Sequence, residues 1–189
     1  MLPNFNAEGI LPPFYGGTIT TGSSHSPYDT KAVQVVQTLC TSDTRRKIAA
    51  GWLGHREGLR QAGVTEGFQW IGGSYLENRE PRDIDVVTFF NATEVASQVG
   101  LNKSEFMTQH RHLFFTSETK ARFLVDAYFV DTSLPFAAAL KQSAFWLNLF
   151  SHQRGTRLWK GMLKVDLVQG SAHDLDATDL LEALSAEET

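Results

Sequence analysis

The sequence has little cysteine, no apolar run long enough to cross a membrane and no excess of basic residues. Its single cysteine, Cys40, excludes an intrachain disulfide and a cysteine metal cluster, which is typical of a reducing compartment. No stretch approaches the ~20 apolar residues that a membrane-spanning helix needs. The N-terminus also lacks the basic and apolar regions of a secretory signal. We therefore expect a cytoplasmic protein without a membrane partner.

Charge is spread unevenly along the chain. The formal net charge of −4 argues against a surface that coats nucleic acid. From Ser171 onward there are six acidic residues and no lysine or arginine, which leaves 17 basic and 15 acidic side chains in the preceding part. Leucines alternate with these acids over 174–184, so the acidic tail predicts an amphipathic helix that docks on the body or on a protein partner.

Length and composition predict one folded domain with appendages. A chain of 189 residues with 42% apolar content can bury a sizeable core. Four of the six prolines lie in residues 1–30, which predicts an N-terminal loop extension held down by apolar anchors. We expect a main domain at 31–170, with its core at 42–131 and a C-terminal helical part at 132–170, followed by the tail at 171–189. The apolar anchors of the N-terminal extension are expected to be Ile10, Leu11, Phe14 and Tyr15.

Hydrophobic periodicity outlines a mixed α/β fold. The patterns predict helices at 31–39, 42–62, 91–99, 104–112 and 134–150, and strands at 68–72, 83–90, 120–131 and 163–168. A short twisted sheet with helices packed on it and a C-terminal helical element is therefore expected. The predicted buried stripe of the helix at 134–150 is Leu134, Ala137, Leu140, Ala144, Leu147 and Phe150.

Two features of these helices need a structural reason. Gly51, Gly54 and Gly58 share a stripe of the helix at 42–62, and each costs roughly 1 kcal/mol relative to alanine, so we expect close contact with another backbone there. His55 on the neighbouring apolar stripe is expected to be a hydrogen-bonded core histidine. The segment 110–112, His-Arg-His, predicts a solvated basic surface, with contact to an acceptor substrate as the alternative.

A glycine turn and a pair of aspartates stand at the facing ends of two predicted strands. The first strand ends at Gly72, Gly73 and Ser74, and the second begins with Asp83 and Asp85. Side chains two apart on a strand point the same way, with Cα atoms about 6.6 Å apart. The glycines let backbone approach a phosphate chain, and the serine offers a hydroxyl and an N–H to its oxygens.

Paired carboxylates raise each other's pKa unless a cation lies between them. Mg²⁺ suits this arrangement because it prefers carboxylate, water and phosphate oxygens, and two such ions about 3.5–4 Å apart can promote phosphoryl transfer. Asp126 lies within the apolar strand at 120–131 and also needs a partner. In the purely structural alternative, Asp83 caps a turn, Asp85 pairs with Arg79 or Arg82, and Asp126 pairs with Arg122. Asp131 at the strand's end is expected to be a turn residue.

The glycine turn followed by Asp83-Ile84-Asp85-Val86 resembles the signature of the DNA polymerase β-type nucleotidyltransferase superfamily, especially its minimal single-domain bacterial members. The resemblance covers roughly residues 45–130. It implies that Asp83 and Asp85 hold two Mg²⁺ ions, and that Asp126 is a third ligand or the base for the acceptor hydroxyl. It also implies that Gly73 and Ser74 grip the phosphates of a nucleoside triphosphate such as ATP.

Basic side chains follow the helix at 134–150. Arg154 and Lys160 lie in this cluster and suit a triphosphate or an anionic acceptor, although cations also suit the C-terminal end of a helix dipole. The expected activity is transfer of a nucleoside monophosphate to a hydroxyl of a protein, an RNA or a small molecule. The alternative is a binding module of the same fold without turnover, such as a toxin–antitoxin or defence-system component.

Overall fold

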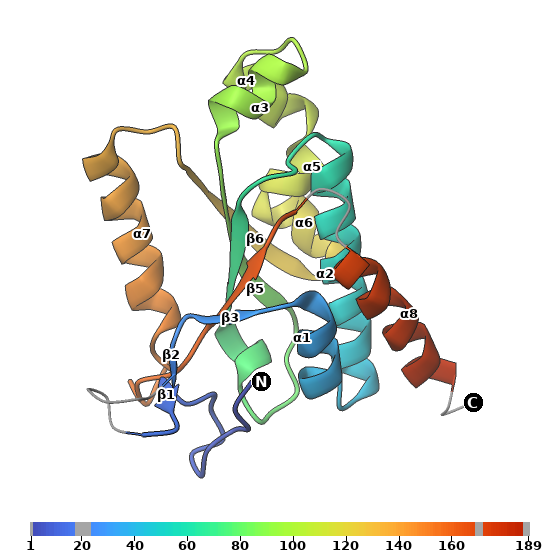
Figure 1. The fold of residues 1–189 in the computed structure, drawn as a ribbon, viewed down its shortest axis with the longest axis vertical. Helices are drawn as coiled ribbons and strands as arrows, with labels where there is room; N and C mark the ends of the chain where they lie inside the picture. Colours follow the sequence, from blue (N-terminus) through green and yellow to red (C-terminus); the bar gives the residue numbers. More distant parts are fainter. Residues whose placement is uncertain (1, 18–23, 169–171, 187–189) are drawn as a thin grey trace.

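A five-stranded mixed sheet forms the centre of this computed structural model, which describes residues 2–17, 24–168 and 172–186 (Figure 1). The mixed α/β fold class is as predicted. The outer strands run parallel to their neighbours, whereas the central strand β4 is antiparallel to both of the strands beside it. In spatial order the strands are β3 (Tyr28–Thr30), β7 (Leu163–Asp166), β4 (Phe68–Gly72), β5 (Ile84–Phe90) and β6 (Val125–Asp131).

Helices cover the two faces of the sheet unequally. In Figure 1, α1, α2, α6 and α8 gather on one side, and α7 stands on the other. The helices are α1 (Ala32–Leu39), α2 (Asp43–Gln61), α3 (Ala92–Gln98), α4 (Lys103–Gln109), α5 (Arg111–Phe114), α6 (Thr116–Phe123), α7 (Phe136–Phe150) and α8 (Ala172–Ala186), with a 3₁₀ turn, η1, at Gly73–Leu76.

The main core lies between the sheet and helices α1 and α2. Trp52 of α2 and Ile71 of β4 are fully buried there. A second apolar cluster around α3, α4 and α5 includes the buried Leu59, Phe90 and Phe106. Burial of this kind supplies most of the driving force for folding.

Helix α2 confirms its predicted cap and its core histidine, and of its three predicted backbone contacts at glycine only the one at Gly51 is found. Ser42 caps it by accepting a hydrogen bond from the backbone N–H of Arg45. A Cβ added to Gly51 would lie only 1.9 Å from the carbonyl oxygen of Phe123, which explains the glycine. His55 is buried, its Nε2 lies 2.9 Å from the carbonyl oxygen of Leu113, and burial lowers its pKa to about 4.

The predicted strand at 120–131 is wrong in its first part. Residues 116–123 form α6, which ends at Leu124 in the left-handed conformation (φ 57°), and β6 starts only at Val125. The basic residues Lys120 and Arg122 occupy the last turn of α6, where cations suit the helix dipole. Asp131 is also not a simple turn residue. It is buried at the end of β6, and its carboxylate accepts the backbone N–H of Ala92 at 3.2 Å.

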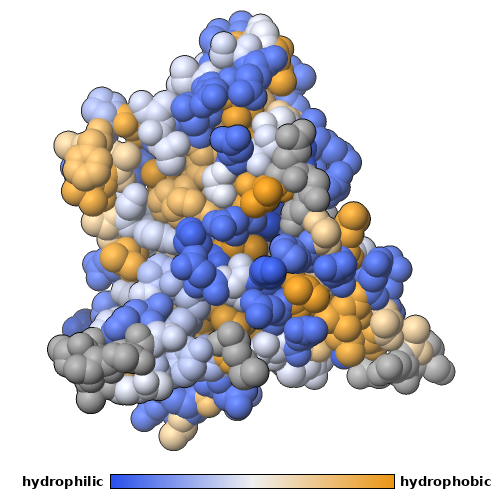
Figure 2. Space-filling model, in the orientation of Figure 1, coloured by the Kyte–Doolittle hydropathy of each residue, from blue (hydrophilic) through white to orange (hydrophobic). Residues whose placement is uncertain are grey.

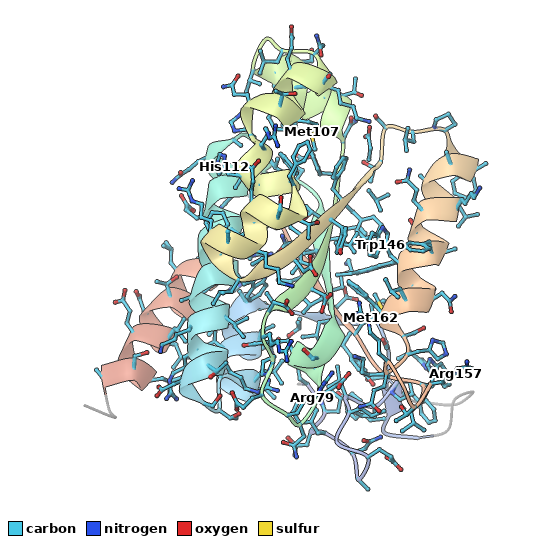
Figure 3. The ribbon with its side chains drawn as sticks, turned by 180° about the vertical axis from the view of Figure 1, so that it is seen from behind. Arg79, Met107, His112, Trp146, Arg157 and Met162 are labelled. Carbon is cyan, nitrogen blue, oxygen red and sulfur yellow. The ribbon has the colours of Figure 1, made fainter. Side chains whose placement is uncertain are left out.

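Helix α7 has the predicted extent and a different buried face. Trp146 points toward the sheet in Figure 3 and packs on Tyr128, with 4.4 Å between the ring centroids and 40° between the ring planes. Phe150 is the only buried residue of the helix. Of the predicted stripe, Leu140 and Leu147 remain exposed, and Figure 2 shows hydrophobic residues of α7 at the surface. The reason is that Trp146 and Phe150 pack on the sheet, and hydrophobic periodicity alone does not predict these contacts.

Two further predictions are corrected. The helix predicted at 104–112 is broken at His110 into α4 and α5. The N-terminal region is more than a loop, because β3 joins the main sheet and β1 (Phe14–Tyr15) pairs with β2 (Ser24–His25). Its predicted anchors Ile10 and Leu11 are buried. The part of this region at 18–23 lies outside the described residues.

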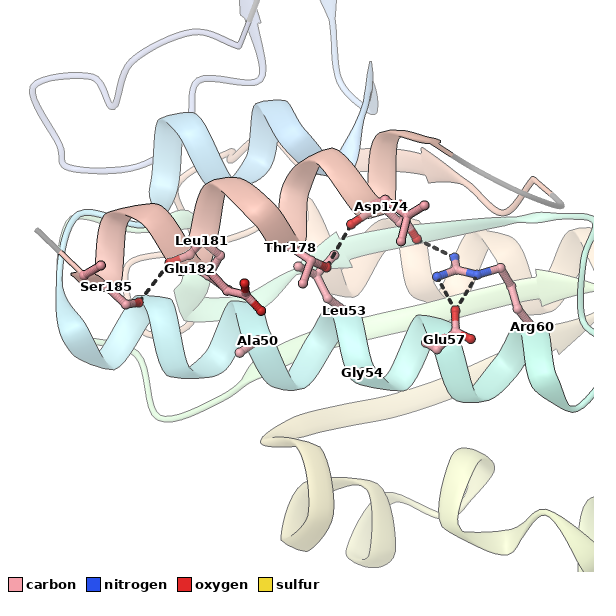
Figure 4. A pocket seen from close by; sticks show the side chains of 12 residues that line it. Ala50, Leu53, Gly54, Glu57, Arg60, Asp174, Thr178, Leu181, Glu182 and Ser185 are labelled. Carbon is pink, nitrogen blue, oxygen red and sulfur yellow. Dashed lines mark hydrogen bonds and ion pairs between the residues drawn. The ribbon is translucent and has the colours of Figure 1, made fainter.

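Helix α8 packs along α2 and α1, and Figure 4 shows the groove of about 730 Å³ between α8 and α2. Asp174 is buried and accepts hydrogen bonds from the guanidinium groups of Arg56 at 2.7 Å and Arg60 at 2.5 Å. The first acid of the tail is therefore bound within the molecule. Leu175 faces outward, and positions 169–171 and 187–189 lie outside the described residues.

No helix in the described part of the chain has the length and apolar character to span a membrane.

Candidate active site

Three aspartates meet at one end of the sheet. Asp85 of β5 and Asp126 of β6 are directly opposite each other in the parallel register, and Gly72 at the end of β4 is opposite Asp85 on the other side. Asp83 immediately precedes β5 and shares the side-chain direction of Asp85. All three aspartates line one cleft of about 150 Å³.

The predicted glycine turn lies against these carboxylates. Gly73 has φ +67°, and a Cβ there would fall 1.6 Å from Oδ2 of Asp85, so both its conformation and its closeness to the aspartate require glycine. Ser74 follows in η1 and lines the cleft. Gly72 has another role, because a Cβ there would lie 2.4 Å from the ring of Phe150. Its small size makes room for α7.

Two buried cations hold the turn in place. Arg45 of α2 donates hydrogen bonds of 2.9 Å to the carbonyl oxygens of Tyr75 and Arg79. Lys160 donates from Nζ to the carbonyl oxygen of Gly73 at 2.7 Å and to Oε1 of Glu77 at 3.0 Å. Buried backbone carbonyls need such partners, so these contacts fix the position of the turn beside Asp85.

Glu77 is the counter-charge of Lys160 inside the protein. Both side chains are almost completely buried. Burial alone would raise the pKa of Glu77, but hydrogen bonds from Lys160 and Gln153 hold that pKa below its usual range. The ammonium group of Lys160 is therefore bound to protein oxygens at the wall of the cleft. Arg154 also lines the cleft, and its side chain is exposed.

The ammonium group of Lys120 lies among the aspartates. Its Nζ is 2.5 Å from Oδ2 of Asp83 and 3.7 Å from Oδ2 of Asp126. The hydrogen bond to Asp83 and the neighbouring carboxylates raise the pKa of Lys120. This one cation does not neutralise the whole cluster. Burial, followed by the charges of Asp83 and Asp126, raises the pKa of Asp85 to about 6.

The donor atoms fit a divalent cation. Oδ1 of Asp126 is buried and accepts no hydrogen bond, and the carboxylate of Asp85 makes no ion pair with any described residue. Across residues 2–17, 24–168 and 172–186, no three histidine, cysteine or acidic side chains are already arranged as a metal site. In this cleft the Lys120 ammonium is the nearest cation to Asp83. The carboxylates of Asp83, Asp85 and Asp126 are the hard oxygen ligands that Mg²⁺ prefers.

The structure brings together most of the site residues proposed from the sequence. The cleft is lined by Gly73, Ser74, Asp83, Asp85, Asp126, Arg154 and Lys160. The ion pairs of the structural alternative are not formed in the described chain: Arg79 pairs with Glu77, and Lys120 takes the place assigned to Arg122 beside Asp126.

Sequence reasoning missed three residues of the site. Lys120 was placed on a strand, so its reach from a helix to Asp83 was not foreseen. The sequence could have indicated Glu77, since an acid four residues after Gly73 lies close enough to pair with a cation near the turn. It could not have indicated Arg45, because the position of this residue on α2 resembles that of any helical arginine.

Comparison with known proteins gives a family and no activity. The sequence model of one family, described as a family of unknown function (DUF6932), matches residues 3–166. No curated protein matches the chain, and no solved structure matches it. Since the match covers most of the sequence, the chain belongs to the DUF6932 family of unknown function.

Proposed function

We propose that the protein transfers a nucleoside monophosphate from a nucleoside triphosphate to a hydroxyl group, with Mg²⁺ as cofactor and pyrophosphate as product. One observation carries the proposal: Asp85 and Asp126 face each other on adjacent strands, with Asp83 and the Gly73 turn beside them in the same cleft. The superfamily resemblance calls for a glycine turn and paired aspartates at strand ends, and both are found at such positions here.

The three aspartates would hold the metal cofactor. Asp83, Asp85 and Asp126 would bind Mg²⁺, with two ions expected, and the ions would neutralise charge on the triphosphate and on the reacting oxygens. The acceptor hydroxyl oxygen attacks the α-phosphorus, and the bond from that phosphorus to the bridging α–β oxygen breaks. In the other role that the resemblance allows, Asp126 is the base rather than a metal ligand, and its carboxylate takes the hydroxyl proton.

The glycine turn and Arg154 would bind the leaving phosphates. The Ser74 hydroxyl lines the cleft, and Gly73 keeps backbone close to Asp85 without a side chain in between. Arg154 offers an exposed guanidinium, the group best suited to phosphate. Lys160 lines the same cleft, and its contacts suggest a further role. Since its ammonium group donates to the carbonyl oxygen of Gly73 and to Glu77, we infer that it positions the turn at the wall of the cleft.

Pyrophosphate release tests the proposal. Purified protein with Mg²⁺ and each nucleoside triphosphate is assayed with cell extract as the source of acceptors, and the labelled product is identified as protein, RNA or small molecule. We expect release by the wild type and less than 1% of that rate in Asp83→Asn/Asp85→Asn. The control Asp29→Asn/Asp166→Asn removes the same charge from two exposed carboxylates that pair with Lys164. Equal rates in wild type and in the cleft variant would refute the assignment.

A binding module without turnover is the second candidate, in a toxin–antitoxin or defence system. The observation that favours it is the exposed apolar surface of α7, to which Phe136, Leu140 and Phe145 contribute. In that case Asp83→Asn/Asp85→Asn leaves partner binding unchanged, and no triphosphate is consumed by the wild type.

A further inference from the structure

Lys120 lies where a cation between two of the proposed metal ligands would lie. Its Nζ contacts Oδ2 of Asp83 at 2.5 Å and approaches Oδ2 of Asp126 at 3.7 Å. The lysine comes from the last turn of α6, outside the strands that carry the aspartates. Its side chain is 50% exposed, so its ammonium group can leave the cleft without unfolding the helix.

An ammonium group and a divalent ion cannot use these oxygens together. Mg²⁺ binds carboxylate oxygens at about 2.0–2.1 Å and keeps a full octahedral shell of ligands. A positive group already 2.5 Å from Oδ2 of Asp83 occupies that space and also repels the ion. Binding of the metal ion therefore requires that Lys120 move away from Asp83.

The ion pair with Lys120 leaves other carboxylate oxygens of the cluster without a cation. Oδ1 of Asp126 is buried without a hydrogen bond, and Asp85 faces Asp126 without an ion pair in the described chain. A lysine whose sole task was to neutralise the aspartates would still leave the buried Oδ1 of Asp126 without a hydrogen bond.

We propose that Lys120 is a built-in competitor of the metal ion, which holds Asp83 and Asp126 until Mg²⁺ arrives with the nucleotide. The inference rests on the proposed function for the identity of the metal ligands. It adds that the protein without nucleotide binds divalent ions weakly because of this side chain. The triphosphate, which binds Mg²⁺ itself, then supplies the additional contacts that displace the ammonium group.

Mn²⁺ binding without nucleotide tests the proposal, because free Mn²⁺ is counted directly by electron paramagnetic resonance. Removing the competing charge in Lys120→Gln is expected to tighten Mn²⁺ binding by about three- to fivefold, the upper part of the range for an exposed ion pair. Lys120→Arg keeps the charge and should bind within about twofold of wild type. Lys164→Gln is the matched control, because it removes an equal charge that pairs with exposed Asp29 and Asp166.

The outcomes separate this inference from the proposed function. Tighter binding in Lys120→Gln alone supports competition. Equal binding in wild type and Lys120→Gln, or weaker binding in the variant, overturns the competition and leaves the metal site intact. If neither protein binds Mn²⁺ while circular dichroism shows both folded, the metal site and the proposed function fail together with the inference.

Discussion

At the scale of single residues, the position of Asp85 in the cleft has a cost in stability. Asp85 is buried next to two other carboxylates, and this environment raises its pKa from 3.8 to about 6. At neutral pH the folded protein without metal must therefore keep a charge that its surroundings disfavour. Such unfavourable placement is common at functional sites, where a ligand later supplies the missing interaction.

Asp85→Asn should therefore stabilise the metal-free protein at pH 7.5 by about 1–3 kcal/mol while removing the proposed activity. Because the pKa of Asp85 is higher in the folded state, stability declines as the pH rises from about 4 to 6. Below this window the carboxyl is protonated in both states, and the substitution should have little effect. Urea denaturation in EDTA at pH 3.5 and 7.5 measures both values. A loss of stability at pH 7.5 would contradict this account of Asp85.

At the scale of elements, α2 shows how glycine positions reflect packing. Gly51 faces the carbonyl oxygen of Phe123 at the end of α6, with no space for a methyl group. Gly54, one turn later, would meet the Phe123 ring only at 3.7 Å, an ordinary contact distance. The two glycines share a stripe in the sequence, but only the first lies at a contact between backbones.

Gly51→Ala and Gly54→Ala should therefore change stability in opposite directions. We expect Gly51→Ala to lower the free energy of unfolding by more than 2 kcal/mol, because α6 must shift. Gly54→Ala should raise it by up to about 1 kcal/mol, because alanine favours the helix. Thermal and urea unfolding of both variants checks the pair. Similar losses in both would mean that α6 does not approach α2 as closely as described.

The elements were predicted where periodicity and caps agreed. The extent of α2 and the strands β4 and β5 follow from the sequence, since Ser42, Gly63 and the glycine turn mark their ends. The strand at 120–131 was extended too far because Ala121, Phe123 and Val125 alternate like a strand. The left-handed residue Leu124, which separates α6 from β6, carries no sequence signal of its own.

The candidate site could be predicted further than its supports. Local spacing was sufficient to pair Asp83 with Asp85, and burial singled out Asp126. The contacts of Lys160 with Glu77 and of Lys120 with Asp83 join residues 83 and 37 positions apart in the chain. Such pairs depend on tertiary structure, so one sequence could not reveal them.

At the scale of the whole molecule, the strand order explains why the site forms where it does. The strands β4, β5 and β6 are neighbours in the sheet, so the end of β4 and the starts of β5 and β6 lie together. Helix α7 closes one side through Phe150, and the segment after it supplies Arg154 and Lys160 to the cleft. The N-terminal strand β3 lies beyond β7 on the other side of β4, and helix α8 packs on α1 and α2.

The most direct test of the central claim is calorimetric titration of a nucleoside triphosphate with a non-hydrolysable α–β bridge into the purified protein, in Mg²⁺ and in EDTA. The account predicts micromolar binding in Mg²⁺, at least tenfold weaker binding in EDTA, and no measurable binding by folded Asp83→Asn/Asp85→Asn. If none of the four common nucleoside triphosphate analogues of this kind binds in Mg²⁺, or if wild type and the double variant bind equally, the result contradicts the account.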